Sequence, residues 1–389
     1  MVNDSDGSTE SEYYDFDPSQ EFYPGERRYV PHWEIWIKCV FYTIIIGFSL
    51  LGNILIVLIV YRHKRMRTTT NFYIVNLAIA DLMVTLSCTW VSLVDDVTEG
   101  WVLGEYFCKF NTFAHVLSLV ASVLTLTLIA YDRFFGIVFA MKAHMSERKA
   151  KTSIIVVWVC SVIVGSPLLF FRILNRRQWK DHLELWCDDD WPVSHILDPV
   201  TNTTRVEMPW RTAYYTGVSV VLFFMPMLVM SIAYSVIIWT LKTQTAPGEN
   251  VPRNNSGQNR ARKKVIFMLV VILVVFAVCW LPTQVYLLYT EHRTERLPMG
   301  DWYHKFEFAA RYLAYCNSAL NPLIYAGFND NFKQGLWKIL GIATRKPSFL
   351  CGEGKSYGTY SSTGLTSVQL VTAPGADSPV KGGMAVTAV

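Results

Sequence analysis

An acid and a base, Asp132-Arg133, stand side by side at the end of the third of seven long apolar runs. A charged side chain in or near hydrocarbon costs roughly 2.5–3.5 kcal/mol on membrane-insertion scales. Either the two side chains reach the aqueous edge of a membrane, which needs no function, or their charges serve a function at this position. The pair alone leaves both interpretations open.

The groups that carry enzyme chemistry are not assembled in this chain. His, Asp and Glu do not occur at metal-ligand spacing, and neither a nucleophile elbow nor a phosphate-binding loop is present. We therefore predict that the protein is not an enzyme. We also expect no nucleic-acid partner.

Hydropathy predicts the elements that hold these residues. Apolar residues make up 52% of the chain and charged residues only 17%, which is few for a soluble protein of this length. A soluble helical core would show polar residues at helical period, and the apolar runs mostly lack them. We predict an all-α membrane protein, a seven-transmembrane helix bundle in the lipid bilayer over residues 35–327, with spans of the ~20 residues that a crossing needs. The spans are expected at 35–61, 71–94, 105–137, 150–171, 212–241, 262–290 and 304–327.

Charges on the connections predict the orientation. Nine acids and two arginines precede the first span, whereas the first connection reads Arg62-His63-Lys64-Arg65 and the third and fifth connections are also basic. Because positive loops stay in the cytoplasm, residues 1–34 should form an extracellular segment without fixed structure, in a protein of the plasma membrane. The first helix should act as an uncleaved signal-anchor.

Three further strings lie inside the spans. Asp81 is in the second, Cys279-Trp280-Leu281-Pro282 in the sixth and Asn321-Pro322-Leu323-Ile324-Tyr325 in the seventh. With Asp132-Arg133, they resemble the rhodopsin-like (class A) family of G-protein-coupled receptors. The resemblance implies a receptor that activates a heterotrimeric G protein, with the Gq type favoured.

The resemblance also implies which residues change place on activation. Arg133 leaves Asp132 and faces the G protein, while the sixth helix swings at a hinge beside Trp280 and Pro282. The residues expected to repack or to support the open state are Val123, Pro226, Phe276, Tyr234, Asn321, Pro322 and Tyr325. A static packing role for the helix-kinking prolines remains the alternative.

The buried polar residues have two interpretations. In the family that the chain resembles, the positions of Asp81, Ser122, Asn317 and Asn321 surround a sodium ion, and no other cofactor is implied. The alternative is a plain hydrogen-bond network between helices, to which Asn53 would also belong.

Two cysteines lie on the predicted outside. Cys108 begins the third span and Cys187 lies in the second outside loop, both in an oxidising compartment. Spacing cannot set their connectivity, but the family resemblance implies a disulfide between them.

Two ligand classes lose support. The aspartate that amine receptors carry in the third helix is His115 here, and no lysine that could hold retinal lies between residues 306 and 325. Acids instead concentrate on the outside loops, in Asp95-Asp96 and Asp188-Asp189-Asp190. They would attract a basic peptide, although a merely solvated acidic surface is the alternative.

The sequences at 66–77 and 96–101 narrow the expected ligand class, since they resemble receptors of the orexin, allatotropin, SIFamide and neuropeptide FF group. The predicted ligand contacts are Asp96, His115, Asp188, Asp189, Gln284, Tyr286, Arg311 and Tyr315. For Arg311, an ion pair with Glu307 one turn earlier is the alternative.

Residues 328–342 should form an amphipathic cytoplasmic helix and 343–389 a disordered tail. Cys351 is a candidate palmitoylation site, and Asn3 and Asn202 are candidate glycosylation sites. Phosphorylated serines and threonines of the tail would bind arrestin, and the final Thr387-Ala388-Val389 resembles a PDZ-binding terminus.

Two other functions stay open. One is a receptor of the same fold for a non-peptide ligand. The other is a membrane transporter, which would usually show internal repeats; none is evident in this sequence.

Overall fold

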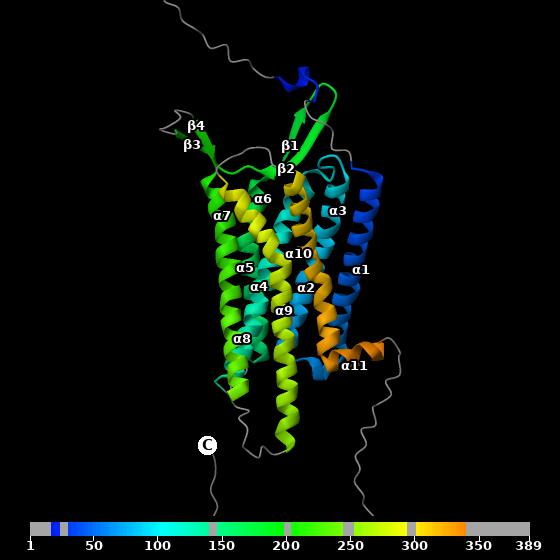
Figure 1. Cartoon of the computed structure of the whole chain (residues 1–389), viewed down its shortest axis with the longest axis vertical. Helices are drawn as coiled ribbons and strands as arrows, with labels where there is room; N and C mark the ends of the chain where they lie inside the picture. Colours follow the sequence, from blue (N-terminus) through cyan, green and yellow to red (C-terminus); the bar gives the residue numbers. More distant parts are fainter. Residues whose placement is uncertain are drawn as a thin grey trace, which may run out of the picture. The chain divides into compact units, whose positions relative to one another are not determined.

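The computed structural model describes residues 17–23, 30–139, 146–197, 204–243, 253–293 and 301–339. Long helices lie alongside one another, with two strand pairs at one end, the hairpin end, and a short helix at the other, the α11 end (Figure 1). The helices are α1 (His32–Arg62), α2 (Thr69–Val84), α3 (Trp90–Val97), α4 (Gly104–Ile137), α5 (Glu147–Gly165), α6 (Pro167–Phe171), α7 (Pro209–Ser219), α8 (Met225–Thr243), α9 (Arg253–His292), α10 (Asp301–Phe328) and α11 (Asp330–Ile339).

Six helical segments of the described chain are long and apolar enough to cross a membrane. The seventh predicted span is α10, whose first half carries Lys305, Glu307 and Arg311 and is therefore less apolar. Its polar groups meet other helices, since Arg311 contacts α3 and Asn321 donates a hydrogen bond to Asp81 of α2. Polar side chains that find partners inside a bundle are tolerated at membrane depth. The polar side chains of the seventh helix therefore face other helices of the bundle.

Two of the predicted spans contain a π-helical turn. Thr85–Thr89 joins α2 to α3, and Val220–Phe224 joins α7 to α8 directly before Pro226. A proline lacks the backbone N–H that the preceding turn needs, and a widened turn is one way to accommodate the loss. Pro282 and Pro322, in contrast, lie inside continuous helices.

The sixth helix is longer than we predicted, which corrects the position of the basic residues in the fifth connection. α9 begins at Arg253 and not at 262, so Arg260 and Lys264 are helical. An apolar run marks only the part of a helix inside hydrocarbon, whereas the helix itself can continue into water. Lys264 Nζ then pairs with Asp330 Oδ1 of α11 at 2.6 Å.

The main apolar core joins α1, α2, α4, α8, α9 and α10, and it includes Val123, Phe276 and Trp280. The first and seventh helices meet closely at Gly52, because a Cβ atom there would lie 2.5 Å from Pro322 Cβ. Only glycine allows that approach.

The long connection after α6 forms two strand pairs, which the sequence had not led us to predict. β1 (Arg172–Gln178) pairs antiparallel with β2 (Leu183–Asp189), and β3 (Ser194–Leu197) pairs with β4 (Thr204–Glu207). Cys187 of β2 is bonded to Cys108 of α4, with a Cα–Cα distance of 5.7 Å. The predicted disulfide is confirmed, and it fixes the β1–β2 hairpin to the third span.

Part of the amino-terminal segment, for which we predicted no fixed structure, rests on this hairpin. Tyr23 packs edge-on against Trp179, with ring centroids 5.6 Å apart, and its backbone N–H donates to Asp181 Oδ1 at 3.0 Å. The N–H of Lys180 donates to the carbonyl of Glu21. Residues 17–23 therefore have a defined place at the hairpin end.

Candidate functional site

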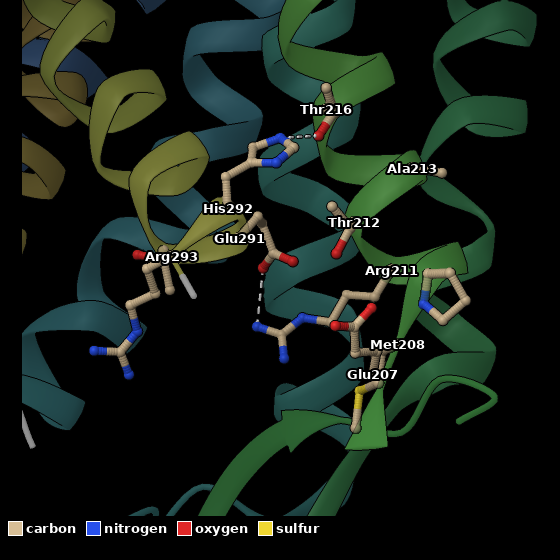
Figure 2. A pocket seen from close by; sticks show the side chains of 11 residues that line it. Glu207, Met208, Arg211, Thr212, Ala213, Thr216, Glu291, His292 and Arg293 are labelled. Atoms are coloured by element: carbon tan, nitrogen blue, oxygen red, sulfur yellow. Dashed lines mark hydrogen bonds and ion pairs between the residues drawn. The ribbon is translucent and has the colours of Figure 1, made fainter. Parts of the chain in front are cut away.

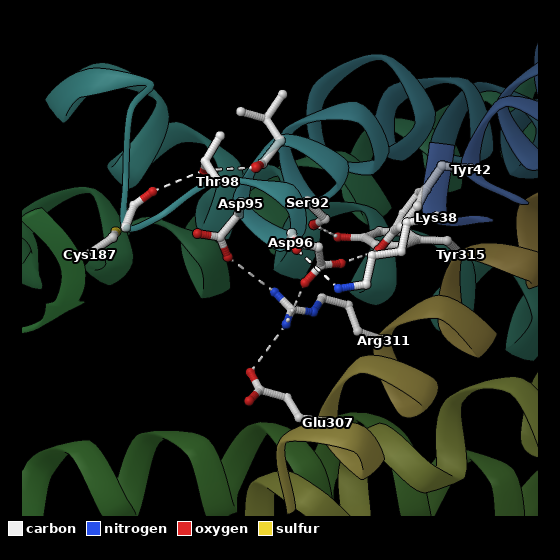
Figure 3. Close-up of polar contacts among 12 residues, drawn as sticks. Lys38, Tyr42, Ser92, Asp95, Asp96, Thr98, Cys187, Glu307, Arg311 and Tyr315 are labelled. Atoms are coloured by element: carbon white, nitrogen blue, oxygen red, sulfur yellow. Dashed lines mark hydrogen bonds and ion pairs between the residues drawn. The ribbon is translucent and has the colours of Figure 1, made fainter. Parts of the chain in front are cut away.

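Arg311 of α10 lies among three carboxylates at the hairpin end of the bundle (Figure 3). Its guanidinium nitrogens are 3.5 Å from Asp95 Oδ2, 3.4 Å from Asp96 Oδ1 and 3.4 Å from Glu307 Oε1. The predicted ion pair with Glu307 on the same helix is therefore present, and Arg311 also pairs with two acids of α3 that we had not predicted as its partners. Its contact with a ligand stays a prediction. Three carboxylates around one guanidinium leave an excess of negative charge.

Asp96 is the most heavily bonded member of this acidic cluster. Its side chain is only 4% exposed and accepts a hydrogen bond from the hydroxyl of Tyr42 at 2.7 Å. Lys38 Nζ donates to the backbone carbonyl of Asp96 and pairs with Glu34 at 2.6 Å. Neither Lys38 nor Tyr42 was predicted, because nothing in the apolar pattern of the first span shows which face meets α3.

Below the acidic cluster, aromatic rings and polar groups of four helices, α3, α4, α9 and α10, meet. The Tyr315 hydroxyl lies 2.7 Å from Ser92 Oγ, and the His115 ring lies 5.8 Å from Tyr315 and 5.3 Å from Trp280, centroid to centroid. Four buried polar atoms here have no hydrogen-bond partner among the described residues: His115 Nε2, Ser118 Oγ, Trp280 Nε1 and Gln284 Oε1. An unpaired buried polar group costs about 1–3 kcal/mol. The arrangement therefore favours a ligand with polar groups of its own.

Tyr286 joins the acidic cluster from the side of α9. Its hydroxyl lies within electrostatic reach of Glu307, and its ring stacks on Tyr303 with centroids 4.9 Å apart. The structure thus brings five of the predicted ligand contacts into one region, namely Asp96, His115, Tyr286, Arg311 and Tyr315. Gln284 is buried one turn after Trp280 on α9.

The two predicted acids of the hairpin have different surroundings. Asp188 is exposed, whereas the side chain of Asp189 is 2% exposed. Asp189 accepts from Arg172 Nη1 at 2.9 Å and from the Tyr215 hydroxyl at 2.7 Å, and it lies 3.6 Å from Arg211 Nε. A carboxylate with these partners holds the hairpin against α7, and its contact with a ligand stays a prediction.

Arg211 extends this network to the sixth span. Its Nη2 lies 3.0 Å from Glu291 Oε1, and a dashed line marks this pair in Figure 2. The two residues line a cavity of about 720 Å³ between α7 and the end of α9, where His292 Nε2 and Thr216 Oγ1 are 2.9 Å apart. We had not predicted Arg211 or Glu291, although a charge directly beside the end of an apolar run is a signal that could have indicated them.

Deeper in the bundle, Asp81 is 2% exposed and accepts a hydrogen bond from Asn321 Nδ2 at 2.8 Å. Ser318, a residue we had not selected, also hydrogen-bonds to this carboxylate. The side-chain oxygens of Asn53, Asn317 and Asn321 have no partner among the described residues. Ser122 is likewise buried. Sodium prefers hard oxygen ligands of this kind, so the residues present fit the predicted ion.

Toward the α11 end, Asp132 Oδ2 and Arg133 Nη2 are 3.0 Å apart, with the Asp132 side chain 2% exposed. Tyr234 and Tyr325 are both buried. Phe276 lies 6.0 Å from Trp280 and 6.2 Å from Phe223, centroid to centroid. The ion pair is thus closed. Four of the residues predicted to repack or to support the open state lie in one apolar core, namely Val123, Tyr234, Phe276 and Tyr325.

Three predicted modification sites, Asn3, Asn202 and Cys351, lie outside the described residues. The tail residues predicted for arrestin and PDZ binding do so as well. Among the described residues, no group of His, Cys, Asp and Glu side chains could hold a metal ion such as zinc.

Comparison with known proteins gives a consistent result. The model of the family described as "7 transmembrane receptor (rhodopsin family)" matches residues 52–325. The Substance-P receptor of Rattus norvegicus is 31% identical over 308 residues, which cover 78% of this chain and 71% of that protein. The QRFP-like peptide receptor of Branchiostoma floridae is 33% identical over 319 residues, covering 80% and 79%. The Substance-P receptor of Homo sapiens is 28% identical over 345 residues, covering 89% and 78%.

Proposed function

Since this chain belongs to the rhodopsin family of seven-transmembrane receptors, we propose that it is a multi-pass receptor of the plasma membrane that an extracellular neuropeptide activates. The active receptor exchanges nucleotide on a heterotrimeric G protein. Similarity to the Substance-P receptor and the QRFP-like peptide receptor supports a peptide ligand. The subgroup that the loop strings resemble and the preference for Gq-type proteins stay predictions.

The acidic cluster around Arg311 is the observation that carries this proposal. The negative charge of three carboxylates exceeds the positive charge of Arg311; they belong to Asp95, Asp96 and Glu307. A peptide whose end carries a positive charge is therefore favoured there. The unpaired polar atoms of His115, Trp280 and Gln284 below it offer hydrogen bonds to the same peptide. A fixed set of charges in a confined site discriminates between ligands more strongly than a solvated acidic surface would.

The chain's own residues connect this site to the α11 end. His115 contacts Trp280, and Trp280 contacts Phe276 within the main core. A peptide that displaces His115 or Tyr315 would change the packing around Trp280. Because the side chains of a dense core pack in a few discrete arrangements, a change at one end of the core can shift the arrangement at the other end. The end result is release of Arg133 from Asp132 at the face that the G protein contacts.

The proposed orientation places the hairpin end outside and the α11 end in the cytoplasm, because the basic connections lie at the α11 end.

A bound sodium ion at Asp81 would stabilise the inactive bundle. In the same scheme the phosphorylated tail binds arrestin, and the carboxyl terminus binds a PDZ domain.

The direct test is nucleotide exchange in membranes that contain the chain together with purified G proteins of the Gq, Gi and Gs types. A library of basic peptides should include members that speed exchange at least tenfold, whereas the same peptides with neutral replacements of their basic residues should not. Arg133→Ala, at equal surface expression, is the matched inactive control. Exchange that no peptide accelerates, together with saturable uptake of a small solute, would favour a transporter instead.

A further inference from the structure

A cavity of about 550 Å³ opens on the outer side of the bundle between α4 and α5, and no residue of the proposed ligand site or signalling path lines it. It is lined by Leu124, Thr127, Leu128, Arg148, Lys149, Thr152, Ser153, Val156, Val157 and Cys160. α5 turns much of its surface outward, and Val156 is 53% exposed. The cavity therefore faces the lipid that surrounds the bundle.

The walls and the length of the cavity match one lipid chain. Leu124 and Leu128 of α4 face Val156 and Val157 of α5, and the hydroxyl of Thr152 is bonded to the backbone of its own helix. Arg148 and Cys160 lie twelve residues apart on α5, which is about 18 Å of helix. The hydrocarbon core is about 30 Å thick, so the cavity runs from the head-group level to roughly the middle of the bilayer.

The mouth of the cavity is strongly positive. Arg148 and Lys149 are exposed in the first turn of α5, and neither has an ion-pair partner among the described residues. The nearest acid, Glu147, is occupied by Lys151 at 2.7 Å. Cations are unusual at a helix amino terminus, where the helix dipole already contributes positive charge. The two side chains add to that positive field, and an anion at this mouth would form ion pairs with both cations.

We propose that this cavity binds an anionic phospholipid of the cytoplasmic leaflet, with its phosphate at Arg148 and Lys149 and one acyl chain along Leu128 and Val156. Only a molecule with an anionic head and a long apolar chain matches both ends of the cavity. The leaflet follows from the orientation in the proposed function. Because Leu128 lies one turn before Asp132 on α4, the bound lipid supports the helix segment that holds the Asp132–Arg133 pair.

The test is native mass spectrometry of the purified full chain in micelles that contain equal amounts of dioleoylphosphatidylserine and dioleoylphosphatidylcholine. Arg148→Gln with Lys149→Gln should lower the preference of the first bound lipid for phosphatidylserine about thirtyfold, which corresponds to about 1 kcal/mol for each cation near a head group. Val156→Trp fills the channel and should remove one bound lipid of either kind.

Two matched controls separate the site from general effects. Lys242→Gln removes an exposed positive charge in the last turn of α8, outside the cavity lining, and Val159→Trp adds the same bulk at a residue that is also 53% exposed. Both should leave lipid binding unchanged. Three outcomes would overturn the proposal. They are an equal loss of bound lipid in the controls, an unchanged preference for phosphatidylserine in the double variant, and a Val156→Trp variant that loses only a bound sterol. The measurement needs neither peptide nor G protein. A negative result for lipid binding would therefore not contradict the proposed function, and a negative result for peptide-driven exchange would not contradict this lipid site.

Discussion

At the scale of single residues, three buried carboxylates differ only in what surrounds them. Asp81 faces the amide of Asn321, Asp132 faces the guanidinium next to it in sequence, and Asp189 lies between two arginines and a tyrosine. Unpaired amide oxygens lie in the same region as Asp81 and can hold an ion. Asp132 has one ion-pair partner, Arg133, and a longer contact with Thr70, whereas the several partners of Asp189 fix the hairpin.

Asp132→Asn should raise nucleotide exchange in the absence of peptide several-fold, because Arg133 loses the charge that holds it at 3.0 Å. Exchange is measured without ligand at matched surface expression. Glu147→Gln is the control, since it breaks an exposed pair with Lys151 that is worth little and should leave basal exchange as it is. A basal rate that does not rise in Asp132→Asn would show that the pair does not restrain the receptor.

Asp81→Asn should abolish the effect of sodium on agonist affinity, because the substitution keeps the size of the side chain and removes the charge that holds the ion. Moving a 1:99 equilibrium to 99:1 takes about 5.5 kcal/mol of differential affinity, so an ion that binds only the inactive bundle opposes the agonist. Competition curves in sodium and in an organic cation at equal ionic strength measure this. An equal sodium-specific shift in mutant and parent would make Asp81 one member of a structural network.

At the scale of elements, the contact between α1 and α10 depends on the absence of a side chain. Gly52 lets Pro322 approach to a distance at which any Cβ atom would collide with it. The same seventh helix carries Arg311 and Asn321 toward other helices, so its position decides whether both polar sites can form.

Gly52→Ala should therefore destabilise the receptor by about 1–3 kcal/mol and lower its thermal midpoint by about 5 °C, because overpacking forces the two backbones apart. The measurement is ligand-free thermal unfolding of the purified protein. Gly47→Ala on the same helix is the control, since its Cβ would meet nothing within 4 Å, and it should be neutral or slightly stabilising. Equal midpoints for the two variants would contradict the close contact.

At the scale of the whole molecule, acids gather at the hairpin end and bases at the α11 end, and the hairpin end has both exposed and buried acids. Exposed charges act at a distance on an approaching ligand, whereas buried ones act on the fold. The string Asp188-Asp189-Asp190 contains both kinds.

Asp188→Asn with Asp190→Asn should slow the association of a basic peptide about threefold to tenfold at low salt and flatten its salt dependence, because both acids are exposed and their attraction is screened by ions. Association rates at several ionic strengths measure the effect. Asp189→Asn should instead cost about 2 kcal/mol of stability, because the partly buried Arg172 would lose its carboxylate and Arg211 would keep only Glu291. An unchanged association rate in the double variant would mean that these acids are only solvated surface.

The sequence by itself determined the spans, the predicted orientation and the polar residues that the membrane cannot tolerate without partners. Hydropathy and charge are local properties, so Asp81, Asp132 and Arg311 stand out without any knowledge of contacts. The amino-terminal extension of α9 beyond the apolar run escaped this reasoning, because helix outside hydrocarbon leaves no hydropathy signal.

Only the tertiary structure decided which polar groups meet. Arg311 contacts Asp95 and Asp96, which lie more than 200 residues earlier in the chain, and Asp189 is buried although its two neighbours in sequence are exposed. Helix rotation and strand pleat set the direction of each side chain, and these depend on packing against elements that are distant in sequence. Composition can therefore show that a buried charge needs a partner, but packing alone selects the partner.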